Sequence, residues 1–410
     1  MSLELITDEL FQEHIKKANR QFYEQSPQMA RHLAKRGYDV KIVGYEVEGD
    51  VKVSGVLFSS TIAGGLHMEL HNGPVFTDPR YLKDFFQELK QFAKKLNVLE
   101  LVVKPFTTYQ TFDSYGNPTC EPRDLIIKDL IDLGYQHQGL QVGFDSGDWY
   151  YLKDLSAVTV DTLTASFSKN GIRQAKKGHE LGIKIKSISR DELDLFHTIT
   201  SATSKRQGFE DKDLEYYKVI FDTWGEEGAD FLVTTINFQE YKEKISEIIN
   251  QLQAEIKPVE AQLSETPDKS KLKTRLNTLQ IQIEAQQKKL SEAERLVERY
   301  GNQETYLSAG LFVYLDKEAY YLHGGSYPEF SSFPAPTLLQ EYVMKKAITK
   351  GIYTYNFLCF SGLFDGKDGV LRFKQNFNGY IMRTPGVFTY LPRPYKYQFY
   401  QLIKKFLRRS

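Results

Sequence analysis

One segment of the chain has side chains suited to binding phosphate groups. Between Lys169 and Lys186 it carries Arg173, Lys176 and Lys177 together with further cations. Clustered cations of this kind neutralise the phosphates of a polyanion. Lys plus Arg equals Asp plus Glu, at 53 each, so the chain as a whole has no net charge to attract such a partner. Any polyanion must therefore be held by a local basic surface.

Two histidines have a spacing that occurs in metal sites. His67 and His71 are four residues apart, which suits metal ligation only on a helix. The surrounding sequence is rich in glycine and continues into Asn72-Gly73-Pro74, which favours a strand followed by a turn. We therefore expect no metal site here.

The C-terminal segment, residues 395–410, has the pattern of a basic amphipathic helix. Apolar residues at helical spacing lie among cations, namely Ile403, Phe406 and Leu407 among Lys404, Lys405, Arg408 and Arg409. Such a helix could lie on an anionic membrane surface. It could equally pack on the body of the protein and leave its basic face in water.

Composition indicates a globular protein of a reducing compartment. Of 410 residues, 41% are hydrophobic and 26% are charged, which is enough for a sizeable core. The two cysteines, Cys120 and Cys359, lie far apart, so no disulfide framework is indicated. The N-terminus has acids where a signal peptide needs cations, and no apolar run is long enough to cross a membrane. We expect a cytoplasmic protein, with peripheral contact to the inner face of the membrane left open.

The elements that position these side chains alternate between helices and strands. In residues 1–150 the pattern predicts a helix capped by Thr7, strands at 40–47 and 51–58, a helix at 79–96 and a strand at 99–103. It starts again after Trp149, with helices at 161–181 and 190–203, strands at 183–188, 231–238, 307–314, 318–323 and 353–357, and a helix capped by Thr337 and ended by Gly351. The predicted fold class is α/β (α+β), with two modules, 1–150 and 151–238 plus 306–410, in one body.

Residues 239–305 form the clearest local pattern in the chain. Apolar residues step by three and four in two runs, Ile245, Ile249, Leu252, Ile256, Val259 and Leu263, and then Leu276, Leu279, Ile283, Leu290 and Val297. A turn sequence at 264–268 separates the runs, and the other positions are mostly Glu, Lys and Gln. This predicts an antiparallel coiled-coil arm inserted in the second module, with a kink at Pro258. The arm could be structural, could form a dimer, or could lie along a long partner such as tRNA.

The order of several short motifs resembles the Fem family of non-ribosomal peptidyltransferases, which includes FemA, FemB, FemX, MurM and MurN. The resemblance covers nearly the whole chain. Its carriers are Gln25-Ser26, Arg36-Gly37-Tyr38, Asn72-Gly73-Pro74-Val75, the segments 171–177, 208–212 and 320–325, Tyr355-Asn356-Phe357, Ser361-Gly362 and the segment 372–377. The segment 64–69 is most similar to the MurN branch.

This resemblance implies two acetyltransferase-like (GNAT) modules and an aminoacyltransferase activity. The donor would be aminoacyl-tRNA and the acceptor a lipid-linked peptidoglycan precursor, with no metal or other cofactor. For the MurN branch the transferred amino acid would be alanine. Arg173, Lys176 and Lys177 would then contact tRNA.

The resemblance also implies roles for particular residues. The pair Phe373-Lys374 matches the family's reaction centre, although by itself Lys374 could be a surface lysine beside a core Phe373. Lys212 and Tyr216 match positions that contact the acceptor. They could also be an exposed lysine and a packed tyrosine. Lysine is a point charge without the fork of arginine.

Other substrate-binding positions are less directly indicated. The family's phosphate-binding lysine in the early helix aligns with Leu33, and Lys35 or Arg36 could replace it. Gly324 and Gly325 could let a ligand approach the backbone, although a tight turn would also need glycine.

One departure from the family pattern concerns the base of the reaction. Family members often have an aspartate before a proline at the end of the strand at 99–103, and this chain has Lys104 before Pro105. A carboxylate base at that position is excluded, so the acceptor of the amine proton is open.

Two other functions also remain open: an acyl-CoA N-acyltransferase of GNAT type, and a non-catalytic module that binds tRNA. Against the first, the chain has no Arg/Gln-x-x-Gly-x-Gly loop for a pyrophosphate.

Overall fold

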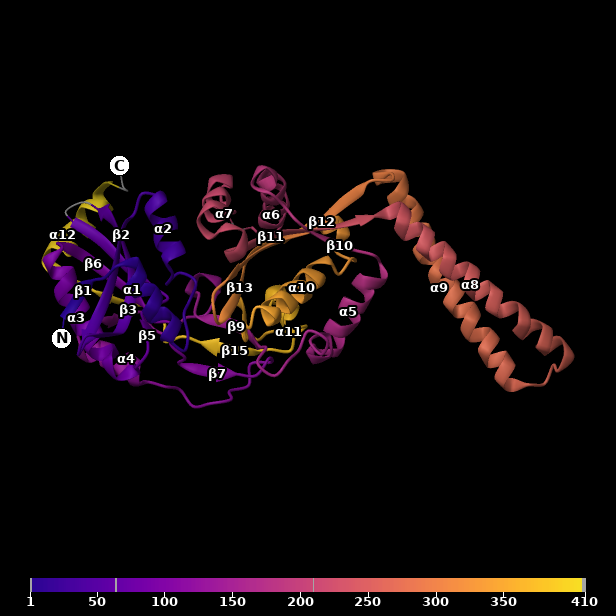
Figure 1. Ribbon diagram of the computed structural model, residues 1–410, viewed down its shortest axis with the longest axis horizontal. Coiled ribbons are helices and arrows are strands. Elements are labelled where there is room, and N and C mark those ends of the chain that lie inside the picture. The colour runs from indigo at the N-terminus through magenta and orange to yellow at the C-terminus, as the bar shows by residue number, and fades with distance from the viewer. Residues whose placement is uncertain (1, 63–64, 209, 408–410) are drawn as a thin grey trace.

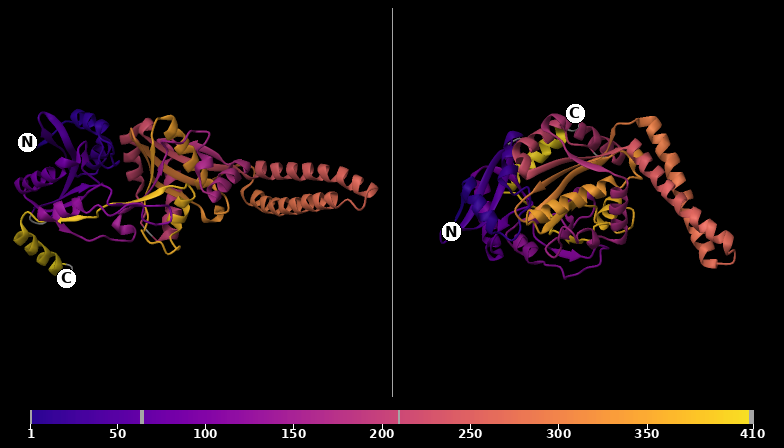
Figure 2. Two further views of the ribbon diagram at one scale, coloured as in Figure 1. Left: turned by 90° about the horizontal axis from the view of Figure 1, so that it is seen from below. Right: turned by 45° about the vertical axis from the view of Figure 1, so that its right-hand side comes forward.

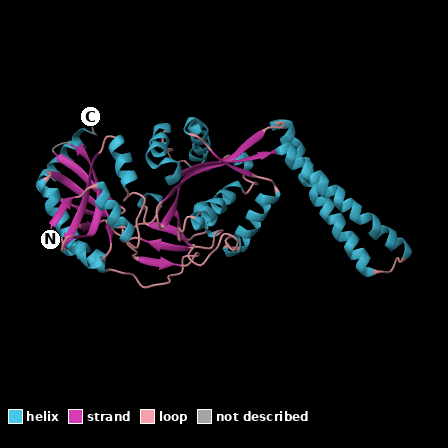
Figure 3. Ribbon diagram, viewed as in Figure 1, coloured by secondary structure: helices cyan, strands magenta, loops and turns pink. Residues whose placement is uncertain are grey.

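The computed structural model describes residues 2–62, 65–208 and 210–407, with side chains described to residue 402 at the C-terminal end. Two mixed sheets flanked by helices form an elongated body, and a helical hairpin projects from one end of it (Figure 1). Figure 3 separates the strand-rich body from the purely helical arm. The predicted α/β body with an inserted hairpin is therefore confirmed.

The first sheet is built mainly from the N-terminal third of the chain. Its order is β1 (Ser2–Leu5), β2 (Asp39–Val47), β3 (Asp50–Ile62), β4 (Gly65–His71), β6 (Val98–Lys104), β16 (Phe388–Tyr390) and β8 (Gln136–His137), and β5 (Val75–Phe76) pairs with β3. The pair β4 and β6 is parallel, so His71 and Lys104 lie side by side at the ends of their strands.

The second sheet carries the hairpin. Its order is β10 (Lys184–Ser187), β11 (Ala229–Asn237), β12 (Glu304–Tyr314), β13 (Glu318–Ser326), β14 (Thr354–Cys359), β9 (Trp149–Asp154), β15 (Tyr380–Arg383) and β7 (Gln110–Phe112). The pair β13 and β14 is parallel, like β4 and β6 in the first sheet. Each sheet thus contains a parallel pair within a largely antiparallel arrangement.

Strand pairing crosses the predicted module boundaries. The segment 1–150 supplies β7 to the second sheet, and the segment 306–410 supplies β16 to the first. A division at residue 150 therefore cuts through both sheets. The two halves are tied together by these exchanged strands.

Helices cover the sheets, and each covered face has its own apolar core. They are α1 (Asp8–Lys17), α2 (Pro27–Lys35), α3 (Leu82–Lys95), α4 (Leu125–Asp132), α5 (Lys169–Glu180), α6 (Leu193–Gln207), α7 (Leu214–Gly228), α10 (Ala335–Thr349), α11 (Gly369–Gln375) and α12 (Pro394–Leu407). Phe85, Phe86 and Leu89 of α3 pack on the first sheet. Helices α6 and α7 cover one face of the second sheet, and α10 covers the other. Within the described residues, no helix is long and apolar enough to cross a membrane.

The hairpin consists of α8 (Phe238–Glu265) and α9 (Ser270–Tyr300), inserted between β11 and β12. Its lengths of 28 and 31 residues correspond to about 42 and 46 Å at 1.5 Å per residue. Every residue predicted for the seam is buried or half-buried. Pro258 lies inside α8, which continues as one helix on both sides of it. The predicted kink at Pro258 therefore does not interrupt the arm.

Two local predictions are wrong. The helix predicted at 161–181 begins only at Lys169, because the Ser168 side chain caps it by accepting from the Gly171 N–H. Thr337 does not cap α10, which begins at Ala335 after Pro334. Gln340, predicted as its capping partner, instead accepts a hydrogen bond from the Tyr355 hydroxyl inside the core.

Candidate active site

Lys374 is a buried cation at the junction between the sheets. Its side chain extends from the short helix α11, and the residue is only 3% exposed. Its Nζ donates to the carbonyl oxygens of Leu358 at 2.9 Å and Cys359 at 2.6 Å. Burial lowers the pKa of Lys374 to about 8. The alternative of a surface lysine is excluded by this burial.

The two carbonyls that hold Lys374 come from an irregular end of β14. The register between β14 and β9 shifts between Asn356 and Cys359. Leu358 has a φ of 59°, a left-handed conformation that is uncommon for a residue with a side chain. The Asn356 side chain holds this turn by accepting from the Leu358 N–H at 2.8 Å. Backbone strain of this kind is often found at functional sites.

Phe373 points into a different space from Lys374. It is half-buried and packs edge-on against Phe377, with ring centroids 5.4 Å apart. It lines a cavity of about 230 Å³ together with residues of α5 and of the first turn of α10. Phe373 therefore lines this cavity, whereas Lys374, its neighbour in the sequence, binds the carbonyls at the end of β14.

A second buried lysine lies close to the first. Lys104, at the end of β6, donates to the carbonyl oxygens of Ser146 at 3.0 Å and Gly147 at 2.7 Å, and its Nζ is 3.6 Å from Asp148 Oδ1. The Cys359 thiol also donates to the Gly147 carbonyl, at 3.4 Å. Burial raises the pKa of that thiol, against the opposing charges of Lys104 and Lys374. Lys104, Cys359 and Lys374 thus form one group, in which both lysines are buried.

The same group includes a carboxylate that the sequence pattern did not indicate. Glu24 Oε2 lies 2.9 Å from His71 Nδ1 and accepts from Asn72 Nδ2 at 2.6 Å. The Tyr150 hydroxyl donates to Asn72 Oδ1 at 3.0 Å. We call Glu24, His71, Asn72, Lys104, Tyr150, Cys359 and Lys374 the central polar cluster.

Electrostatics within the central polar cluster favour a charged Glu24–His71 pair. Burial alone would raise the pKa of Glu24, but His71, Asn72 and Lys104 outweigh it, so that pKa is lowered. In turn, Glu24 raises the pKa of His71 against burial and the charge of Lys104. The His71 side chain is 39% exposed, so the pair can be reached from solvent.

The predicted acceptor-binding residues meet beside this cluster, around Tyr216. The Arg36 guanidinium lies 5.6 Å and the Lys212 ammonium 5.7 Å from the centre of the Tyr216 ring. The Tyr216 hydroxyl is hydrogen-bonded to His323 Nε2 at 3.0 Å. Burial raises the pKa of Tyr216. The Glu24 charge raises it further, whereas the Arg36 charge lowers it. We call Arg36, Lys212, Tyr216 and His323 the Tyr216 cluster.

Local hydrogen bonds fix the position of Lys212. Its neighbour Asp211 accepts from Thr200, Ser201 and Tyr217 at 2.8 to 3.0 Å, which ties the loop to α6 and α7. Asp213 caps α7 by accepting from the Tyr216 N–H. Lys212 itself is exposed, so its charge is presented to solvent next to Arg36. Phe209, in the same predicted motif, lies outside the described residues.

Other predicted site residues are placed differently. Lys35 is exposed and its charge acts on Asp222 of α7, so Arg36 is the member of that pair that reaches Tyr216. Gly324 and Gly325 lie within β13 and not in a turn. A Cβ on Gly324 would meet the Tyr321 hydroxyl at 1.8 Å, and one on Gly325 would meet the Ile199 carbonyl at 2.6 Å. Close packing therefore explains both glycines without a ligand.

Arg173, Lys176 and Lys177 lie exposed on α5, remote in sequence but close in space to the root of the hairpin. Lys177 donates to the Ser332 carbonyl at 2.7 Å. It also lines a groove of about 310 Å³ between α5 and the hairpin, together with Lys244 of α8 and Lys289 of α9. Glu180 and Glu292 lie in the same groove. The predicted phosphate-binding segment thus adjoins the arm.

The histidine pair is held by carboxylates. His67 and His71 both lie in the strand β4, so their spacing is not the helical one of a metal site. His67 contacts Glu69 and Glu100, each at 2.8 Å, whereas His71 contacts Glu24. In the part of the chain that the structure describes, no three His, Cys, Asp or Glu side chains are grouped to hold a metal.

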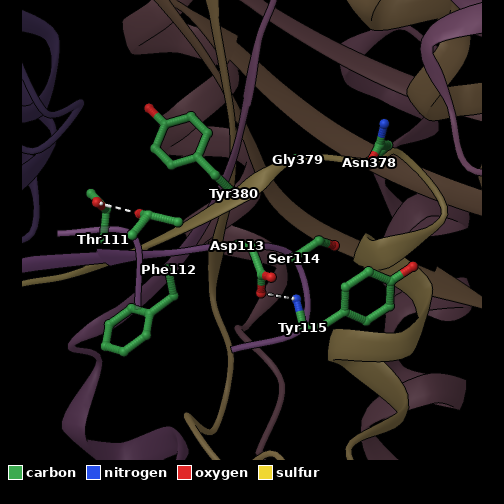
Figure 4. A pocket seen from close by; sticks show the side chains of 9 residues that line it. Thr111, Phe112, Asp113, Ser114, Tyr115, Asn378, Gly379 and Tyr380 are labelled. Atoms are coloured by element: carbon green, nitrogen blue, oxygen red, sulfur yellow. Dashed lines mark hydrogen bonds between the residues drawn. The ribbon is translucent and has the colours of Figure 1, made fainter. Parts of the chain in front are cut away.

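A cavity of about 540 Å³ beside β7 and β15 is separate from both clusters (Figure 4). Figure 4 shows Asp113, Ser114 and Tyr115 on one loop and Tyr380 across from them. The Asp113 carboxylate is used by its own loop, accepting from the N–H groups of Tyr115 and Asn117. None of the predicted site residues lines it. We assign it no role.

Five residues of the central polar cluster were not predicted as part of the site: Glu24, His71, Asn72, Tyr150 and Cys359. The sequence signals were indirect: Asn72 belongs to a motif of the resemblance, and Lys104 stood where a carboxylate was expected. Several Asp and Glu residues could have replaced the missing carboxylate, and no spacing in the sequence pointed to Glu24 among them. The parallel pairing of β4 with β6 is what brings His71 next to Lys104.

Comparison with known proteins finds relatives along nearly the whole chain. The model of the FemAB family matches residues 6–405. Aminoacyltransferase FemA of Staphylococcus aureus (strain MRSA252) is 28% identical over 380 residues, which cover 90% of each chain. The FemA of Staphylococcus epidermidis (strain ATCC 12228 / FDA PCI 1200) is 28% identical over 344 residues, or 82% of each chain.

A solved structure supports the fold. The crystal structure of FemX superposes with a TM-score of 0.74 at 21% identity, covering 98% of this chain and 100% of the other. This agreement confirms the predicted class of two GNAT-like modules with an inserted hairpin. The predicted MurN branch is not distinguished by these relatives and stays a prediction, and Gly64 of its motif lies outside the described residues. With a family model that spans nearly its whole length, the chain belongs to the FemAB family.

Proposed function

We propose that this protein is a non-ribosomal aminoacyltransferase. It transfers an amino acid, which we propose to be alanine, from aminoacyl-tRNA to an amino group of a lipid-linked peptidoglycan precursor. That amino group belongs to the stem peptide or to a branch residue already attached to it. The observation that carries the proposal is the position of Lys374, a buried cation near the Glu24–His71 pair and the exposed cations Arg36 and Lys212. The aminoacyltransferase names of the FemA relatives support it.

The reaction is the aminolysis of an ester. The ammonium of the acceptor first loses a proton, and the neutral amine attacks the aminoacyl carbonyl carbon. The new C–N bond forms, the C–O bond to the ribose breaks, and the second amine proton ends on the ribose oxygen. Lys374 supplies positive charge to the oxygen that becomes negative in this step, which is the most effective kind of stabilisation in a water-poor site.

The first proton needs an acceptor, since Lys104 replaces the expected carboxylate. We propose that the neutral form of His71, which is populated above its pKa, accepts this proton through Nε2, while Glu24 holds the imidazole through Nδ1. A carboxylate that orients an imidazole in this way also raises its basicity. In this proposal the acceptor lies between the partly exposed His71 side chain and the Tyr216 cluster.

The Tyr216 cluster is the proposed site for the phosphate groups of the acceptor. Replacing Arg36 or Lys212 with alanine should raise the KM for the precursor about tenfold each, with little change in kcat, because each removes a charge contact to a phosphate. Steady-state kinetics with varied precursor measure this. Lys35→Ala, at the residue that precedes Arg36, is the matched control and should leave KM unchanged. Equal effects of Lys35→Ala and Arg36→Ala would contradict the assignment.

The groove at the hairpin root is the proposed contact for tRNA. Changing Lys244 and Lys289 together to glutamate should weaken tRNA binding by more than tenfold and reduce its salt dependence, because phosphate contacts release counterions. Filter binding across salt concentrations tests this. Lys257→Glu, exposed farther along α8, is the control. Equal loss in the control would indicate a general charge effect and not a groove contact.

The acyl-CoA alternative is disfavoured because the sequence has no Arg/Gln-x-x-Gly-x-Gly loop for a pyrophosphate. The start of α10 is also poorly suited to bind one. Phosphates bind helix N-termini through free N–H groups. Here Pro334 and Pro336 lie at the first turn, and proline has no N–H to donate. This helix therefore offers fewer donors to a pyrophosphate than an ordinary N-terminus.

The transfer itself is tested with purified protein, alanyl-tRNA and seryl-tRNA, and a lysine-containing precursor. A product heavier by one alanine is the expected result. Transfer from acetyl-CoA without tRNA would overturn the proposal. Binding of tRNA with no transfer to any precursor would instead favour the non-catalytic alternative.

A further inference from the structure

The C-terminal helix α12 has two opposite faces with different surroundings. On the inner face, the Tyr397 hydroxyl donates to Glu100 of β6 at 2.7 Å, and burial raises the pKa of Tyr397 to about 12. Arg393, just before the helix, donates to Asn97. These contacts fix the start of the helix on the first sheet.

The outer face of α12 is apolar and exposed. Tyr395, Phe399 and Leu402 are 86%, 65% and 55% exposed. Their spacing of four and three places them in one narrow stripe along the helix. Tyr397 is 200° from Tyr395 at 100° per residue, which agrees with its contact to the body. The stripe therefore points away from the protein.

Charge around the stripe is one-sided. From residue 393 to the C-terminus the sequence has no Asp or Glu, and its cations are Arg393, Lys396, Lys404, Lys405, Arg408 and Arg409. Lys396, next to Tyr395 in the sequence, is exposed, and so is Arg393 just before the helix. Residues 408–410 lie outside the described residues, and so do the side chains from residue 403 onward. Because the chain as a whole is neutral, this end is basic against an acidic remainder.

We propose that α12 is a membrane-docking helix, whose stripe of Tyr395, Phe399 and Leu402 enters the headgroup region of an anionic bilayer. Apolar side chains on one face with cations around them are the pattern of helices that lie in this interface. The cations complement the anionic lipids. A second copy of the chain fits less well, because two stripes facing each other would bring like charges together.

The position of α12 in the molecule suits this role. Figure 2 (left) shows it on the outside of the first module, at the opposite end of the molecule from the hairpin. Docking through α12 therefore leaves the arm and its groove away from the lipid surface. The inference concerns only α12 and does not depend on the transfer reaction.

The sequence left two possibilities open for residues 395–410, contact with a membrane surface and packing on the body. Each of them applies to a different face of α12. The Tyr397 side packs on the body, and the side opposite to it is exposed. The packed side explains why the helix is fixed. The exposed side is the one that needs a partner, because Tyr395, Phe399 and Leu402 are adjacent and apolar.

Vesicle sedimentation tests the proposal with the full-length protein. Wild type is expected to bind vesicles of phosphatidylcholine with phosphatidylglycerol, and to bind pure phosphatidylcholine vesicles weakly. The double variant Phe399→Glu and Leu402→Glu should lower binding at least about tenfold, since it places acids in the stripe. Ile281→Glu on the hairpin, at a residue 57% exposed, makes the same kind of change elsewhere and should bind like wild type.

Three results would overturn the proposal. They are no binding of wild type to anionic vesicles, equal binding of the double variant, and equal binding to both kinds of vesicle. A dimer in solution that the double variant dissociates would instead assign the stripe to a second copy. Thermal unfolding shows whether the double variant is folded. Transfer to a soluble precursor without its lipid separates this test from the proposed reaction, because the double variant should retain that activity.

Discussion

Lys374→Met should lower kcat for aminoacyl transfer by about 100-fold or more, the scale of losing one preorganised charge contact to a developing oxyanion. Methionine keeps most of the volume of the lysine stem and removes the charge. The protein should remain folded, because the lost cation is bonded to two backbone carbonyls and no buried carboxylate is left unpaired. Single-turnover transfer with charged tRNA, together with the midpoint of thermal unfolding, measures both effects.

Lys367→Met is the matched control for this change. It alters an exposed lysine seven residues earlier in the same segment and should have wild-type activity. Lys374→Ala should behave like Lys374→Met in transfer. If Lys374→Met unfolded the protein or left kcat within about twofold of wild type, the lysine would be structural and the proposed role would be lost.

The pH dependence gives a second measurement on the same residue. The pKa of Lys374 is lowered to about 8 by burial, so its charged form is lost as the pH rises through that value. Transfer that needs the ammonium should therefore decline on the alkaline side near pH 8. An ordinary lysine, with its pKa near 10.4, would not produce a decline there.

The helical arm shows what the sequence could predict well. The apolar pattern of its seam repeats over many helical turns, so it does not arise easily by chance. All predicted seam residues are buried or half-buried. The strand β16 shows the opposite case. It has three residues, too few for any periodicity, and it pairs with β6 from more than 280 positions earlier in the chain. No local pattern could have assigned it to the first sheet.

The candidate site was predictable only in part for the same reason. Lys374 was indicated by a resemblance, but its burial depends on two carbonyls that the bulge in β14 turns toward it. Glu24 and His71 are separated by 46 intervening residues and meet only through folding. Arg36 and Lys212 likewise come from different modules and converge on one ring.

Glu24→Gln should lower kcat about tenfold to 100-fold and move the acidic limb of the pH–rate profile to lower pH. The Glu24 charge raises the pKa of His71, so its removal lets that pKa fall. The charges that remain around His71 are Lys104, which lowers its pKa, and Glu69, which raises it. Neutral imidazole is the form that accepts a proton, and its fraction grows as the pH rises above the pKa. The limb therefore follows the pKa of His71 downward.

The direction of this shift separates catalysis from packing. A purely structural Glu24 would lower activity at all pH values and leave the limb in place. His71→Asn should lower kcat by a similar factor and abolish the limb, because asparagine does not titrate in this range. Glu100→Gln is the control: it alters a carboxylate that contacts His67 in the same sheet, so the limb should stay where it is in wild type. An unshifted limb in Glu24→Gln, with the fold intact by thermal unfolding, would exclude the Glu24–His71 pair as the proton acceptor.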